Sequence, residues 1–395
     1  MRIRRAILGL IFAFAFTGYV QRTSISVAAE RMMPELGITQ VQIGWLFTAF
    51  LFTYAVFQIP GALVGQRFGG RRLLAAIGLA TAAASLGTAF GTFFIALLAA
   101  RALLGVAQAA LFPVGAGMIR NWFPMNRWAS GQALVVTGLW SGAAATPALV
   151  AWLMQSYGWR RALIITTVPS LLLVALWYLF ARDRPTDHPS VSDAELAELS
   201  RNPSPQPPTP GSLHRVFSDK QILLITGSYF IMNYVFYLVT FWSFLYLVQA
   251  RHMTVIQSGV LAVLPFIAAG IAAGVGGWVA DRVGMRVLPL VALPTAALFL
   301  YLTVTATNPY WAVAMLCLGF GCVELTEGSY WGATMRRAPG DTMAATAFLN
   351  TGGNLGGVVA TPIIAALSAS TSWTAVFATG AVCSLIAAGL WLKIR

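Results

Sequence analysis

The first long apolar run of the chain carries a positive charge at Arg22. The run begins at Ala6, and at a rise of about 1.5 Å per residue it is long enough to cross a hydrocarbon layer of roughly 30 Å. An arginine inside such a helix costs about 2.5–3.5 kcal/mol, so it normally faces a protein interior or an aqueous cavity. Tyr19 and Ser26 share its helical face. We predict an anion site there; the alternative is an arginine that extends from a helix end to the membrane surface.

A second arginine, Arg101, lies seven residues before Gln108 in a later apolar stretch, so the two share a helical face. A guanidinium binds a carboxylate through two parallel hydrogen bonds, which suits recognition of an organic anion. The alternative is an arginine that anchors the outer end of its helix.

Two acidic residues, Glu324 and Glu327, lie inside an apolar stretch and share a helical face with Trp331. An ionised carboxylate is costly to bury in a membrane helix, and adjacent carboxyl groups favour binding of a proton by one of them. We predict that they take part in proton coupling. The alternatives are a structural pair, a position near water, or a site for the cationic group of a zwitterionic substrate.

The composition is that of a polytopic membrane protein: 58% of the 395 residues are hydrophobic, 9% are charged, and the mean hydropathy is +0.74. The apolar stretches are continuous rather than alternating, which disfavours a barrel. A cleaved signal peptide is the alternative for the first run. The three cysteines lie in apolar runs, and no nucleotide loop, metal-ligand cluster or nucleophile–base motif stands out. We therefore expect no enzyme, no cofactor and no metal site.

The formal net charge of +13 is unevenly distributed along the chain. Most Lys and Arg residues fall in the loops of one side, which is the positive-inside bias of membrane proteins rather than a nucleic-acid surface. We expect the chain to lie in the cell inner (plasma) membrane with both termini in the cytoplasm. No signal for oligomerisation is visible, and we expect a monomer.

Hydropathy and Gly, Pro and charge punctuation predict an all-α protein with about twelve membrane-spanning helices. We expect a six-helix bundle over residues 1–182, a Pro-rich cytoplasmic linker with one short helix over 183–219, and a second six-helix bundle over 220–395. The predicted spans are near 6–29, 41–65, 73–91, 94–121, 129–154, 161–182, 221–249, 256–280, 288–306, 309–334, 343–368 and 373–392.

The two halves resemble each other at an offset of 215 residues. Arg67 corresponds to Arg282 and Gly142 to Gly357, and Thr146-Pro147 recurs as Thr361-Pro362. An even number of spans in each half gives both halves the same orientation, as in transporters built from parallel repeats.

The loop Gly-x-x-x-Asp-Arg-x-Gly-x-Arg at residues 277–286 resembles the cytoplasmic signature of the major facilitator superfamily. Residues 19–29, Phe57-Gln58-Ile59-Pro60-Gly61, Asn121-Trp122-Phe123-Pro124 and residues 350–357 narrow the resemblance to the anion:cation symporter family. That family includes sugar-acid, hexuronate and phthalate permeases and is related to sialin. The resemblance implies the major facilitator fold, two pseudo-symmetric bundles that work by alternating access.

The resemblance also implies roles for particular side chains. It makes Arg22 the main anion ligand, and the other expected ligands are Tyr19, Tyr54, Arg101, Trp331 and Asn350. The cytoplasmic signatures imply a conformational switch formed by Arg67, Arg71, Asp281, Arg282 and Arg286. Each aromatic and amide side chain has a packing role as its alternative.

Three positions depart from the family pattern. Gln21 stands where the family has Asp, Gln108 where it has Glu, and Gln66 where the second signature keeps Asp281. A glutamine side chain does not titrate, which argues against proton symport through Gln21 and Gln108. We predict transport of a small organic anion, with proton symport at Glu327, uniport or exchange, and a zwitterionic substrate left open. A drug exporter and a non-transporting membrane sensor are the rival functions.

Overall fold

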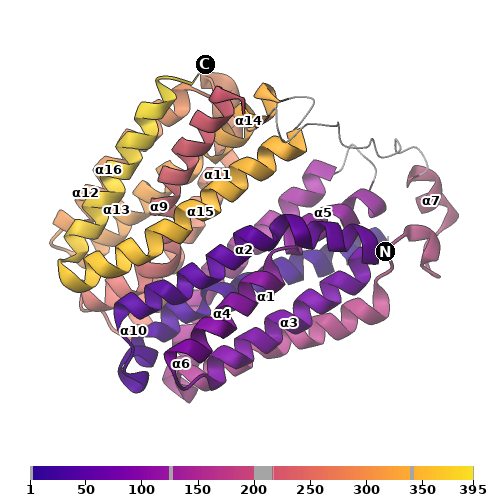
Figure 1. The fold of residues 1–395 in the computed structure, drawn as a ribbon, viewed down its shortest axis with the longest axis horizontal. Helices are drawn as coiled ribbons and strands as arrows, with labels where there is room; N and C mark the ends of the chain where they lie inside the picture. Colours follow the sequence, from indigo (N-terminus) through magenta and orange to yellow (C-terminus); the bar gives the residue numbers. More distant parts are fainter. Residues whose placement is uncertain (1–2, 124–127, 200–215, 217, 339–341, 395) are drawn as a thin grey trace. The chain divides into compact units, whose positions relative to one another are not determined.

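The computed structural model describes residues 3–123, 128–199, 216, 218–338 and 342–394. The Pro-rich stretch 203–210 lies outside the described residues, and so do the side chains of Gln66 and Asp281. The described elements are all helical (Figure 1).

The helices of the first half follow the predicted spans closely. They are α1 (Ile3–Leu36), α2 (Gln40–Phe68), α3 (Gly70–Phe90), α4 (Phe94–Gln108), α5 (Leu111–Trp122) and α6 (Trp128–Phe180), followed by a 3-10 turn (Pro185–Asp187) and α7 (Asp193–Leu199). The second half contains α9 (Lys220–Gln249), α10 (Val255–Leu261), α11 (Val263–Val283), α12 (Val287–Thr305), α13 (Pro309–Leu325), α14 (Glu327–Arg337), α15 (Thr342–Ser370) and α16 (Trp373–Trp391).

Eleven helical stretches within the described residues are long and apolar enough to cross a membrane. One of them, over residues 134–180, is interrupted by Gly158, whose φ of 78° and ψ of 163° are not helical. A glycine adopts positive φ without a steric penalty, so the chain turns there between two spans. The predicted all-helical membrane fold is confirmed, and the break at Gly158 accounts for the predicted pair of spans in this region.

The chain forms two compact units. The amino-terminal unit contains Met1–Met32 and Phe52–Gln206, and the carboxyl-terminal unit contains Met33–Leu51 and Pro207–Arg395. The first half of α2 therefore belongs to the carboxyl-terminal unit, where Phe47 stacks on Phe241 with ring centroids 4.4 Å apart. The division into bundles at 1–182 and 220–395 with a linker between them stays a prediction.

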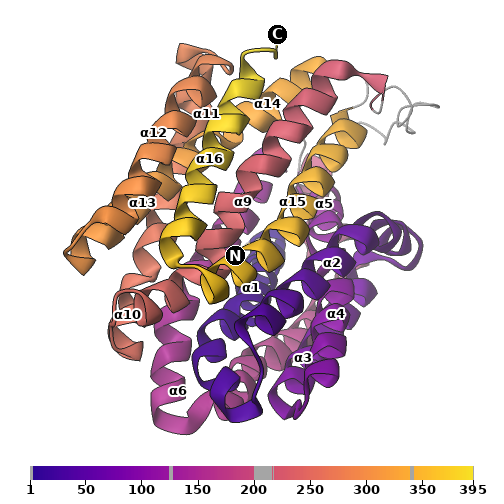
Figure 2. The same cartoon turned by 60° about the vertical axis from the view of Figure 1, so that its left-hand side comes forward.

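Aromatic and aliphatic side chains fill the interior of each unit. In the amino-terminal unit, Phe14 meets Trp177 edge to face at 5.6 Å within a cluster of buried side chains. In the carboxyl-terminal unit, α15 runs beside α9, and α12 packs against both α13 and α16 (Figures 1 and 2). Figure 2 views the same helices from a second direction.

The cytoplasmic signatures have the same local structure in both units. Gly69 and Gly284, 215 residues apart, both have positive φ, at 86° and 101°. Two residues later, the guanidinium of Arg71 donates to the carbonyl of Tyr178, and that of Arg286 donates to the carbonyls of Trp391 and Leu392. In each unit, therefore, the signature arginine binds the last carbonyls of the final helix.

Close contacts between helix backbones give a second repeat, with an offset of 214 residues. A Cβ on Gly142 would collide with the carbonyl of Phe16, and one on Gly356 would collide with the carbonyl of Phe230. The glycines with equivalent packing are thus Gly142 and Gly356, so the predicted match to Gly357 is wrong by one residue. Only glycine permits backbones to approach this closely.

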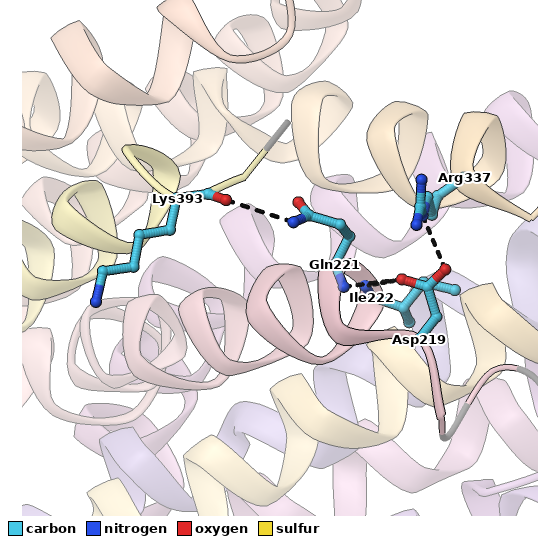
Figure 3. Close-up of polar contacts among 5 residues, drawn as sticks. All are labelled: Asp219, Gln221, Ile222, Arg337 and Lys393. Atoms are coloured by element: carbon cyan, nitrogen blue, oxygen red, sulfur yellow. Dashed lines mark hydrogen bonds and ion pairs between the residues drawn. The ribbon is translucent and has the colours of Figure 1, made fainter.

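The start of α9 is held by Asp219. Its side chain accepts hydrogen bonds from the backbone N–H groups of Gln221 and Ile222, at 2.8 and 3.2 Å, and from Nε of Arg337 at 2.8 Å (Figure 3). Gln221 in turn donates to the carbonyl of Lys393 at 3.5 Å. Burial alone raises the pKa of Asp219, but the hydrogen bonds to Ile222 and Gln221 and the charge of Arg337 outweigh it and lower that pKa below its usual value.

We predict that Asp219→Ala destabilises the protein by about 1 kcal/mol, the usual effect of losing a helix cap. Asp219→Asn keeps a cap acceptor but loses the charge. Because the folded pKa of Asp219 is lowered, its stabilising contribution is present above the pKa of the unfolded carboxyl and is lost as pH falls through the folded pKa. Thermal unfolding in detergent should show a deficit for Asp219→Asn at neutral pH that disappears in acid. The exposed Asp187→Asn is the control, and an equal deficit there would contradict the prediction.

Candidate functional site

Arg22 lies between two tyrosine rings in the amino-terminal unit. Its guanidinium carbon is 4.8 Å from the ring centroid of Tyr19 and 4.4 Å from that of Tyr54, and Nη1 donates to the Tyr19 hydroxyl at 2.9 Å. All three residues are buried. The rings attract the cation electrostatically and fix its orientation. The tyrosine of α2 thus lies beside the arginine of α1, which sequence spacing alone does not predict.

Arg101 of α4 also reaches this position. Its Nη2 donates to the backbone carbonyl of Arg22 at 3.0 Å, and 2% of its surface is exposed. We call Tyr19, Arg22, Tyr54 and Arg101 the arginine cluster. Two guanidinium groups held in an apolar surrounding by aromatic rings and a carbonyl create a strongly positive local field. Such a field suits a carboxylate or sulfonate ligand.

The hydroxyl of Ser26 does not join this cluster through a hydrogen bond that the structure records. It donates to the carbonyl of Thr23 in its own helix, at 2.7 Å. The shared helical face predicted from sequence is correct, but the small side chain is satisfied locally.

Gln21 faces the opposite side of α1 and links three helices. Its amide nitrogen donates to the hydroxyl of Ser170 on α6, and its amide oxygen accepts from the hydroxyl of Ser85 on α3 at 2.8 Å. The side chain is buried. One donor and one acceptor on the same group are both used, so this amide acts as a neutral connector at the position where the resemblance implies an acid.

Gln108 is a second neutral connector. Its amide nitrogen donates to the carbonyl of Gly18 on α1 at 2.9 Å. Beside these groups is a small cavity of about 10 Å³, lined in part by Gln21, Ser85 and Arg101. A cavity of this size accommodates about one water molecule and is too small for an organic anion.

The predicted acidic residues lie in the carboxyl-terminal unit. Oε1 of Glu327 accepts hydrogen bonds from the hydroxyl of Tyr229 on α9, at 2.7 Å, and from the indole N–H of Trp331, at 2.8 Å. Glu324 stands one turn earlier, at the end of α13, with 2% of its surface exposed. We call Tyr229, Glu324, Glu327 and Trp331 the glutamate cluster.

Asn350 is half-buried on α15, and its backbone carbonyl accepts a hydrogen bond from Asn354 at 2.8 Å. Asn354 also accepts one from the hydroxyl of Tyr237 at 2.9 Å. The more buried amide is thus used within the unit, whereas no hydrogen bond to the side-chain amide of Asn350 is found among the described residues. This arrangement keeps Asn350 the better ligand candidate of the two.

The switch residues occupy the helix ends described above. The guanidinium of Arg67 lies 5.6 Å from the ring of Phe68, and that of Arg282 lies 3.7 Å from the ring of Trp278. The backbone N–H of Arg71 donates to Asp183 at 2.8 Å. These contacts tie signature residues to neighbouring helices, while their role in a conformational switch stays a prediction.

The sequence did not identify Tyr229, Ser85 or Ser170 as members of these networks. Tyr229 lies in an aromatic-rich helix where nothing distinguishes it from Tyr234 and Tyr237, which were considered instead. The serines had no periodic signal. Their only marking is that each is a polar residue in an apolar span and therefore needs a partner.

Helices that cross a membrane, a two-unit architecture with repeated local structure, and charged clusters inside the spans define a membrane transporter rather than an enzyme. Residues 10–345 match the Major Facilitator Superfamily, and the chain belongs to that family.

Relatives within the family carry anions according to their names. The chain is 28% identical over 381 residues to the "Probable sulfoacetate transporter SauU" of Cupriavidus necator, which covers 92% of this chain and 87% of that protein. It is 28% identical over 293 residues to the "D-galactonate transporter" of Escherichia coli, covering 71% of this chain and 67% of that protein. The predicted relation to sugar-acid and hexuronate transporters is confirmed.

The fold is similar to that of a solved transporter. The crystal structure of a bacterial homologue of the human lysosomal transporter Spinster matches with a TM-score of 0.78 at 15% identity, covering 99% of this chain and 97% of that one. At this identity the likeness concerns the fold alone.

We predict that Gln21→Leu destabilises the protein by about 1–3 kcal/mol, because it leaves the hydroxyls of Ser85 and Ser170 buried without their partner. Gln108→Leu removes one donor to a carbonyl and should cost less. Thermal unfolding of the two purified variants in one detergent checks the order. An equal or larger loss for Gln108→Leu would contradict the connecting role of Gln21.

Proposed function

We propose that this protein transports a small organic anion, a carboxylate or sulfonate, across the cell inner membrane by alternating access. Arg22 is the main ligand of the anionic group, with Tyr19, Tyr54 and Arg101 around it. Asn350 and Trp331 supply polar and aromatic contacts from the carboxyl-terminal unit. The charge bias of the loops supports an orientation with both termini in the cytoplasm.

The observation that carries this proposal is the burial of Arg22 between two tyrosine rings, with Arg101 donating to its backbone carbonyl. A membrane segment accommodates an arginine only at a cost, so an arginine held in a fixed orientation by aromatic rings is a functional feature by default. The guanidinium supplies paired donors that match the two oxygens of a carboxylate. A drug exporter for apolar compounds would have no use for this arrangement.

The relatives support the choice of anion. Their printed names include sulfoacetate, D-galactonate, galactarate or D-glucarate, and hexuronate. All of these carry a carboxylate, and the first also carries a sulfonate. We therefore place the substrate among small, hydrophilic mono- and dianions.

The test is uptake of radiolabelled sulfoacetate, D-galactonate and D-glucarate into proteoliposomes. A hydrogen bond to a charged group contributes about 1.5–3 kcal/mol. We therefore expect Arg22→Gln to weaken the apparent affinity by roughly 10- to 100-fold. Arg22→Lys keeps the charge but loses the paired donors, and should fall between the wild type and Arg22→Gln.

Arg161→Gln serves as the matched control, because Arg161 is an exposed arginine of the same unit. It should transport as the wild type does. Uptake by Arg22→Gln equal to that of the control, or wild-type efflux of apolar dyes without anion uptake, would overturn the proposed function.

A further inference from the structure

The amino-terminal unit offers no titratable acid at the two positions where the family resemblance implies one. Gln21 and Gln108 stand there, and their amides are engaged with Ser170, Ser85 and the carbonyl of Gly18. An amide cannot bind and release a proton near neutral pH. If a proton gradient drives this transporter, another group must carry the proton.

The glutamate cluster has the geometry for that task. One oxygen of Glu327 accepts from Tyr229 at 2.7 Å and from Trp331 at 2.8 Å. Two donors on one oxygen stabilise a carboxylate and leave the second oxygen for a proton. Glu327 is half-buried rather than sealed, so its carboxyl group can exchange protons with water.

Glu324 is the buried member of the pair. Oε1 of Glu324 has no hydrogen-bond partner among the described residues, and the side chain is 98% buried. Its carboxyl group interacts electrostatically with that of Glu327. Two negative charges at adjacent turns, one with an unsatisfied oxygen, are unfavourable in a surrounding of low polarity, and a shared proton removes one of them.

The helices packed around the cluster supply no compensating cation. Neither glutamate forms an ion pair with a Lys, Arg or His side chain in the described part of the chain. The facing titratable groups are Tyr229 of α9 and Tyr330 of α14, and the hydroxyl of Tyr330 is bonded to Ser228. The sequence of α15 contains no titratable residue, and that of α11 has only Asp281 and Arg282, at its end.

The helix is interrupted between the two glutamates. α13 ends at Leu325, α14 begins at Glu327, and the hydroxyl of Thr326 donates to the carbonyl of Val323 at 2.7 Å. A Cβ on Gly328 would lie 2.7 Å from the Cα of Gly277, so α11 packs directly against the break. Because Glu327 is bonded to Tyr229 of another helix, a displacement of α9 relative to α14 changes how well its charge is stabilised.

We propose that Glu324 and Glu327 together bind one exchangeable proton and form the coupling site of this transporter, in the unit opposite in sequence to the arginine cluster. The proposal rests on the proposed function. Protonation converts the pair from two charges to one as the anion binds, and the same proton leaves to water when the anion is released. No covalent bond to the substrate forms or breaks.

The first test is accumulation of D-galactonate, sulfoacetate and D-glucarate in proteoliposomes with an inward gradient of one pH unit and the membrane potential clamped at zero. One proton per anion supports up to about tenfold accumulation, since each 1.4 kcal/mol corresponds to a factor of ten. Glu327→Gln and Glu324→Gln should lose this accumulation but retain exchange of labelled for unlabelled anion, because exchange requires no net proton movement.

Glu35→Gln, at an exposed acid near the end of α1, is the matched control and should accumulate anion as the wild type does. Tyr229→Phe removes one donor to Glu327 and should shift the pH at which accumulation is half-maximal. Wild-type equilibration that ignores the gradient, unchanged accumulation in both glutamine variants, or loss of exchange together with accumulation would each overturn the proposal.

The second test needs no substrate. Infrared difference spectra of the purified full chain between acidic and alkaline pH should contain the C=O stretch of a protonated carboxylic acid, reduced in Glu324→Gln and Glu327→Gln and unchanged in Glu35→Gln. A band that persists in both glutamate variants overturns the proton site. If none of the three anions is transported while the band behaves as expected, the proposed substrate class fails and the proton site stands.

Discussion

Inside a membrane, a polar group that is not bonded to another group of the protein has no water to replace the partner, and this constraint shapes most of the features described above. Arg101 is satisfied by the carbonyl of Arg22, and Gln21 by the hydroxyls of Ser85 and Ser170. Each of these bonds joins different helices. The polar residues therefore fix how the helices of a unit pack, and the same bonds hold the candidate ligands in place.

The two units share an architecture but differ in chemistry. In both, a glycine of positive φ precedes an arginine that binds the carbonyls of the last helix. In both, a glycine allows the first helix of the unit to approach a later one closely. The interior charges differ: the amino-terminal unit contains Arg22 and Arg101, and the carboxyl-terminal unit contains Glu324 and Glu327. Duplication thus supplies the frame, and the few charged positions within it supply the difference in function.

The neutral positions are as informative as the charged ones. An amide at Gln21 donates and accepts at once, which a carboxylate cannot do without a proton. The substitution of an amide for an acid therefore keeps a structural link between α1, α3 and α6 and removes a titratable group. With that group absent, the glutamate cluster gives the chain another pair of carboxyl groups with hydrogen-bond donors already placed.

The sequence by itself determined the number and approximate limits of the spans, because burial in hydrocarbon demands long apolar stretches whatever the neighbours are. It also determined that Arg22, Arg101, Glu324 and Glu327 are exceptional, since charge in such a stretch is costly. Only the tertiary structure decided their partners. Tyr54 beside Arg22, Tyr229 beside Glu327 and the serines around Gln21 come from other helices, and helical periodicity places residues on a face without saying what that face meets. The one-residue difference between the two repeat offsets was likewise decided by packing, because a backbone contact tolerates a glycine at one position and no side chain there.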